Sequence, residues 1–84
     1  MLDYIEFDDG YAIVKMRPPE LVLDRTLAEA GVRARYGVTV VGVKSPGKSF
    51  THAVPETVVH ADDVMIVSGT RRHVEAFAEL NKPS

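Results

Sequence analysis

The sequence of 84 residues contains no cysteine. The chain can therefore form no disulfide and has no cysteine nucleophile, and this composition fits a reducing compartment. A single domain of this length buries only roughly 60–65 % of the surface that its unfolded chain exposes. With no disulfide to add stability, we expect a domain that is either marginally stable or stabilised by association.

Long apolar runs are also missing. The longest, Val38–Val43 and Val64–Val67, are far shorter than the ~18 residues of a membrane helix. Residues 1–10, MLDYIEFDDG, lack the basic region and the apolar core of a secretory signal. The net charge of −2 argues against non-specific binding to nucleic acid. These absences predict a small cytoplasmic domain that does not insert into a membrane.

The first half of the chain predicts a strand followed by a broken helix. The segment YAIVKM, Tyr11–Met16, is β-branched and mostly apolar, and the prolines that follow cannot continue a strand. Asp24 or Thr26 can cap a helix that reaches about Ala30. A further helical turn then ends at Gly37.

The second half predicts three strands and a final helix. VTVVGVK is the strongest strand, and its Gly42 indicates close packing of another backbone. SFTHA is a short strand with Phe50 on the core side, and Asp62-Asp63 is a turn before the strand VMIVSG. Thr70 caps a helix whose buried stripe is Val74, Phe77, Ala78 and Leu80.

We therefore predict a single α+β domain with the order β-α-β-β-β-α, to which residues 1–10 add either a short edge strand or an arm. It has a small mixed sheet with helices on one face. The other face of the sheet is left exposed, and association with a second copy is the simplest way for so small a chain to bury it.

The residues give little support to catalysis or metal binding. His52, His60 and His73 lie on different predicted elements without ligand spacing, and HADDVM lacks the alternating oxygen ligands of a calcium loop. No serine stands in a Gly-x-Ser-x-Gly elbow, and SPGKS lacks the spacing of a phosphate loop. We predict no catalytic residue, no metal site and no permanent cofactor.

Cationic residues gather around the strongest predicted strand. Arg33 and Arg35 lie at a helix end, and Lys44 lies at the far end of the strand. They are either a solvated rim, favourable at a helix C-terminus, or donors that capture an anion, since arginine offers phosphate a planar fork. The residues alone leave both interpretations open.

The chain resembles a known family in the order of its motifs. RTLAEAGVRARYGVTVVGVK, a short hairpin, VPETVVHADDVMIVSGT and an amphipathic helix resemble the TrkA C-terminal (RCK C-terminal) domain of Ktr and Trk-type potassium transport regulatory subunits. The resemblance predicts a regulatory domain at residues 11–80, a connector or edge arm at 1–10 and a tail at 81–84. The Gly-x-Gly-x-x-Gly motif of the family's dinucleotide-binding half is not in the sequence, and we expect that the chain is an excised domain.

The resemblance implies a cytoplasmic homodimer that regulates a membrane potassium transporter. In the family a small-molecule site lies in the cleft between subunits, and in several members the ligand is cyclic di-AMP. Its two phosphates on a two-fold axis suit a symmetric dimer that offers the same arginine twice. The alternative is a purely structural dimerisation module that relays a signal from a separate nucleotide-binding domain.

Site residues are implied position by position. Arg33 would face the phosphates, with Val32 at the cleft edge and Thr39 in its strand wall. The loop that closes over the base would consist of Ala53, Val54, Pro55 and Thr57. Thr39 and Thr57 stand where cyclic di-AMP binders often have Asn and His, and both have less hydrogen-bonding reach.

Overall fold

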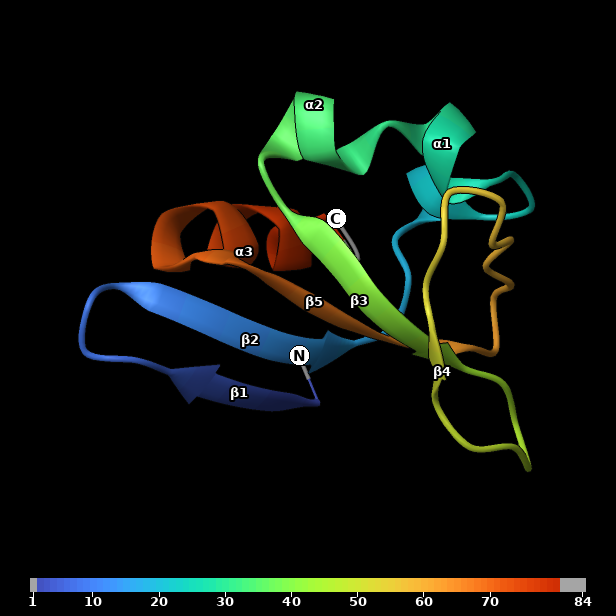
Figure 1. Ribbon diagram of the computed structural model, residues 1–84, viewed down its shortest axis with the longest axis horizontal. Helices are drawn as coiled ribbons and strands as arrows, with labels where there is room; N and C mark the ends of the chain where they lie inside the picture. The colour runs from blue at the N-terminus through green and yellow to red at the C-terminus, as the bar shows by residue number, and fades with distance from the viewer. Residues whose placement is uncertain (1, 81–84) are drawn as a thin grey trace.

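The elements follow the predicted order, with one additional strand at the start. The structure, a computed structural model, describes residues 2–80, so the predicted tail at 81–84 lies outside the described residues. Figure 1 shows the elements, whose bounds are β1 Asp3–Glu6, β2 Tyr11–Met16, the 3-10 turn η1 Glu20–Val22, α1 Leu27–Ala30, α2 Val32–Tyr36, β3 Thr39–Lys44, β4 Thr51–His52, β5 Val64–Thr70 and α3 Arg71–Glu79. None of the described helices is long and apolar enough to cross a bilayer.

The five strands form one sheet in the order β1-β2-β5-β3-β4, and every neighbouring pair is antiparallel. The prediction of a mixed sheet was therefore wrong. β2 and β3 run in the same direction, as expected for strands joined through helices, but β5 lies between them and pairs with both. The parallel strands consequently never become neighbours.

The core lies between the sheet and the helices that cover one of its faces. Alternate residues of β2 and β5 point to this face, so that Val14 pairs with Val67 and Met16 with Met65, all four fully buried. α3 covers these strands with an apolar stripe that includes Phe77. The predicted placement of the helices on one face is confirmed by Tyr36 of α2, whose ring lies 5.6 Å from that of Phe77.

Two predicted core residues are exposed. Phe50 is 37 % exposed because β4 begins one residue later, at the edge of the sheet, and leaves the ring near Lys15 Nζ, 5.8 Å away. Leu80 is 44 % exposed because α3 ends at Glu79 and Leu80 is its C-cap. The prediction for Gly42 is confirmed, since a Cβ added there would lie 3.1 Å from the Thr51 carbonyl oxygen.

The N-terminus of α1 is held by a reciprocal pair of hydrogen bonds. The Glu29 N–H donates to the Thr26 hydroxyl oxygen at 3.1 Å, and the Thr26 N–H donates to the Glu29 carboxylate at 2.8 Å. The bonds from the Thr26 backbone and hydroxyl to this carboxylate lower the pKa of Glu29 below its usual value. The predicted cap at Thr26 is thus confirmed.

Replacing Thr26 by alanine should destabilise the chain by about 1 kcal/mol in urea unfolding, because the Glu29 N–H loses its acceptor.

The depressed pKa of Glu29 adds stability that is present above the unfolded pKa and is lost as the pH falls through the folded pKa. The wild-type advantage over Glu29→Gln should therefore shrink below about pH 4. An advantage that is equal at pH 3 and pH 7 would contradict this assignment.

Candidate functional site

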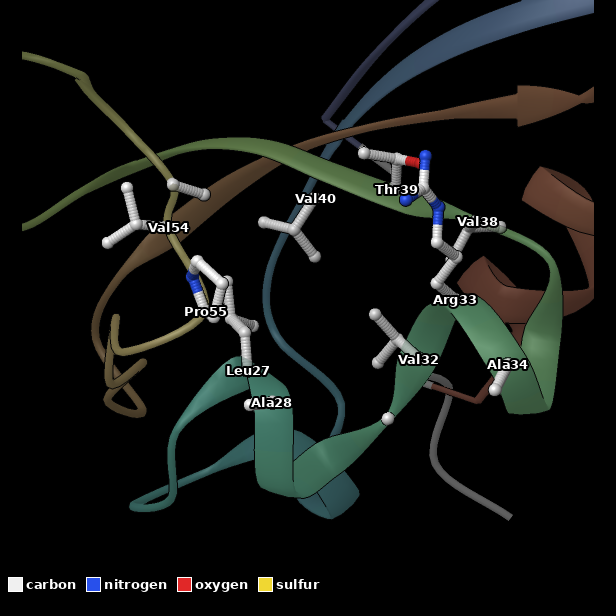
Figure 2. A pocket seen from close by; sticks show the side chains of 12 residues that line it. Leu27, Ala28, Val32, Arg33, Ala34, Val38, Thr39, Val40, Val54 and Pro55 are labelled. Atoms are coloured by element: carbon white, nitrogen blue, oxygen red, sulfur yellow. The ribbon is translucent and has the colours of Figure 1, made fainter.

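A cleft of about 640 Å³ opens between the helical segment and β3 (Figure 2). Three segments that are separate in the sequence form its walls. They contribute Leu27, Ala28, Gly31, Val32, Arg33, Ala34, Val38, Thr39, Val40, Ala53, Val54 and Pro55. Most of these side chains are apolar, and Arg33 is the only charged residue among them.

Six of the seven residues predicted to bind ligand line this cleft, namely Val32, Arg33, Thr39, Ala53, Val54 and Pro55. The seventh, Thr57, does not. Its hydroxyl accepts a hydrogen bond from the Val54 N–H at 2.9 Å, and its own N–H donates to the Val54 carbonyl at 3.0 Å. Thr57 therefore shapes the loop that carries Val54 instead of facing the cleft.

The loop at residues 53–57 is tied to α1 through backbone groups. The Leu27 N–H donates to the Thr57 carbonyl, and the Ala28 N–H donates to the Pro55 carbonyl, both at 2.9 Å. These N–H groups belong to the first turn of α1 and have no acceptor within the helix. The loop thus satisfies them, and the two walls at this end of the cleft are held at a fixed spacing.

Arg33 is placed by the short helix α2. Gly31 and Gly37 flank α2 with φ values of 60° and 71°, a left-handed conformation that glycine adopts without steric cost. Val32 is buried in the core and anchors the start of the helix. The adjacent Arg33 is left exposed at the cleft.

The guanidinium of Arg33 makes no hydrogen bond or ion pair with any residue in the described range 2–80. Arg35 differs, since it donates to the Ala30 carbonyl at 3.5 Å and lies over the Tyr36 ring, 5.4 Å from its centroid. The two arginines, which lie at the same helix end in the sequence, therefore have different environments. Arg33 keeps its donors available for an anion.

The cleft has a polar end and an apolar end. Figure 2 shows Arg33 and Thr39 at one end and Val54 and Pro55 at the other. A guanidinium binds phosphate through paired donors, and aliphatic side chains pack against flat, weakly polar rings. This arrangement suits a ligand that joins an anionic group to a flat, weakly polar ring.

Sequence reasoning missed about half of the lining. Leu27, Ala28, Gly31 and Ala34 belong to the helical segment, Val40 belongs to β3, and Val38 directly precedes that strand. Leu27, Val38 and Val40 have the sequence pattern of core residues, and Ala28, Gly31 and Ala34 have no functional group that would indicate a binding site. Lys44, which the sequence groups with the arginines, does not line the cleft.

Within residues 2–80, no cluster of three or more histidine, aspartate or glutamate side chains is arranged to hold a metal ion. His60 instead contacts Asp24, with 3.1 Å between Nδ1 and Oδ1. We expect that a chelator leaves the melting temperature unchanged within about 1 °C. Removing a metal ion that bound only the folded chain would lower the melting temperature. A substantial fall in the melting temperature with EDTA would show that a metal site exists.

Comparison with known proteins places this geometry in a family. The TrkA-C domain family matches residues 11–82. Ktr system potassium uptake protein A of Bacillus subtilis (strain 168) is 26 % identical over 77 residues, which are 92 % of this chain and 35 % of that protein. The chain thus spans about a third of the length of this curated relative.

Two solved structures share the fold. The GsuK RCK domain superposes with a TM-score of 0.77 at 24 % identity, over 98 % of this chain and 18 % of that one. The RCK C domain of the potassium transport protein KtrA, solved in complex with cyclic diadenosine monophosphate, gives a TM-score of 0.71 at 24 % identity over 84 % of each chain. On its sequence match and its fold, the chain belongs to the TrkA-C domain family.

Proposed function

We propose that the chain is the regulatory domain of a potassium transport system and that a homodimer binds cyclic di-AMP in the cleft. The observation that carries the proposal is Arg33, whose guanidinium has no partner among the described residues at one end of the cleft. Relatedness to a potassium uptake protein supports the regulatory role, at the cytoplasmic side of a membrane cation transporter. The KtrA C domain in complex with cyclic di-AMP supports the ligand class.

The chemistry of cyclic di-AMP matches the two ends of the cleft. Each phosphate can take paired donors from an arginine, and each adenine can pack against aliphatic residues such as Val54 and Pro55. One chain offers a single cleft arginine for two phosphates. A two-fold dimer supplies the second from the same position of its partner.

Exposed apolar side chains support the homodimer. Val54, which lines the cleft, is 50 % exposed, and Val41, Phe50 and, on the uncovered sheet face, Ile5 are exposed as well. Apolar surface of this kind marks interaction sites on small soluble domains. We therefore expect sedimentation at about 20 μM to give twice the chain mass, because interfaces of standard size commonly have dissociation constants at or below the micromolar range. A clean monomer would contradict the dimer.

A purely structural dimerisation module is the second candidate. It is favoured by Thr57, a predicted ligand residue that does not line the cleft and whose hydroxyl accepts a hydrogen bond within its own loop. In such a module the cleft would be empty of nucleotide, and the signal would come from a separate nucleotide-binding domain.

Isothermal titration calorimetry of the chain with cyclic di-AMP separates the two candidates. Saturable binding, with no heat from AMP at the same phosphate concentration, is the result expected for a sensor that requires both phosphates. A dimer that gives no binding heat with either compound would favour the structural module.

A further inference from the structure

The helix that carries Arg33 is too short to hold its own position. α2 has five residues, and glycines in left-handed conformation stand at both ends. Its backbone is closed by bonds from the Arg35 N–H to the Gly31 carbonyl and from the Gly37 N–H to the Arg33 carbonyl, both 3.0 Å. Isolated helices of this length are unstable in water, so contacts with the rest of the fold must hold α2 in place.

The contacts at the C-terminal end of α2 come from α3. The rings of Tyr36 and Phe77 meet at 5.6 Å with an interplanar angle of 55°, and Phe77 is fully buried. The imidazole of His73 packs directly on Gly37, since a Cβ added to that glycine would lie 2.7 Å from His73 Nδ1. Aromatic pairs with this tilted geometry stabilise beyond their buried area.

Contacts at the junction between β5 and α3 also hold the C-terminal end of α2. A Cβ added to Gly69 would lie 3.2 Å from the Gly37 carbonyl oxygen and 3.4 Å from Val74. The backbones of two elements thus approach closely where α2 leads into β3. The opposite side of the cleft is held separately, because α1 is hydrogen-bonded to the loop at residues 53–57.

From these contacts we infer that α3 positions Arg33 through Tyr36 and His73, which makes both of them positioning residues for the cleft. The guanidinium has no bond of its own among the described residues, so its location follows the orientation of α2. That orientation depends on the Tyr36–Phe77 and Gly37–His73 contacts. Occupancy of the cleft is therefore coupled to α3, on the far side of α2 from the ligand. Only the identity of the ligand rests on the proposed function.

Amide hydrogen exchange of the ligand-free chain tests whether Tyr36 and His73 hold α2 in place. Tyr36→Ala and His73→Ala should each accelerate exchange at Arg35 and Gly37 by at least about fivefold, since a lost aromatic contact loosens α2. The Leu27 and Ala28 amides, bonded to the separate loop, should change less than about twofold. Tyr36→Phe keeps the ring and is the matched control, expected to behave as wild type.

Unchanged exchange at Arg35 and Gly37 in His73→Ala and Tyr36→Ala would overturn the inference. Equal acceleration at all four amides would also overturn it, because it would indicate global destabilisation alone. If Tyr36→Ala does not fold, His73→Ala decides the question, since its side chain is exposed and its loss leaves the core intact.

Calorimetry with cyclic di-AMP tests the coupling to Arg33. His73→Ala should weaken binding by at least about threefold in the wild type and by less than about 1.5-fold in Arg33→Lys, whose flexible side chain depends little on the helix orientation. Equal losses in both backgrounds would show that His73 does not act through Arg33. If wild type does not bind cyclic di-AMP, the proposed function fails, and the exchange rates alone decide the inference.

Discussion

Replacing Arg33 by alanine should weaken the binding of cyclic di-AMP by more than roughly tenfold, because a charge-assisted hydrogen bond contributes about 1.5–3 kcal/mol. In a symmetric dimer the substitution removes this contact from both phosphates. The guanidinium makes no internal bond among the described residues, so the fold and the dimer should be unaffected. Calorimetry measures the affinity, and sedimentation checks the dimer.

The matched control is Arg72→Ala on α3, an exposed arginine that does not line the cleft. It should change affinity by less than about threefold, as exposed charges do. Arg35→Ala is less suitable because the Arg35 side chain contacts Ala30 and Tyr36. Raised salt should weaken binding to wild type more than to Arg33→Ala. Equal affinities of wild type and Arg33→Ala would refute the site.

Replacing Phe77 by alanine should destabilise the chain by about 3–5 kcal/mol, the usual cost of removing a fully buried phenylalanine. The substitution leaves a cavity between α3 and the sheet and removes the partner of the Tyr36 ring. Domains have a total stability of only about 5–15 kcal/mol, so the substitution should remove a large fraction of the stability of the chain. Urea or thermal unfolding followed by circular dichroism measures the loss.

Phe7→Ala makes the same chemical change at an exposed position and serves as the control. It should cost less than about 1 kcal/mol, because surface substitutions have small effects. Similar stabilities of Phe77→Ala and Phe7→Ala would contradict the assigned core.

Local signals in the sequence predicted most of the elements. Thr26 and Thr70 cap their helices through the expected side-chain bonds, and Gly37 ends α2 in the left-handed conformation. The antiparallel sheet was not predictable in the same way. Whether the sheet is mixed or antiparallel depends on where β5, the last strand, pairs. No local pattern between Tyr11 and Lys44 indicates that position.

The candidate site was predicted only in part, for a related reason. Arg33 and the loop at residues 53–55 were identified through the family resemblance, and the structure places them on one cleft. Leu27 and Val40 have the sequence pattern of core residues, and only the packing of separate segments leaves them at a cavity. Thr57 does not line the cleft, and its hydroxyl accepts a hydrogen bond within its own loop, which the sequence alone does not indicate.

Native mass spectrometry of the chain with cyclic di-AMP tests the central claim most directly, because it counts chains and ligands in one complex. A cleft closed by two copies, each supplying one Arg33, should give a complex of two chains and one ligand. Arg33→Ala should give the dimer without ligand under the same conditions. A complex of one chain with one ligand, or a wild-type dimer that never retains cyclic di-AMP, would contradict the account.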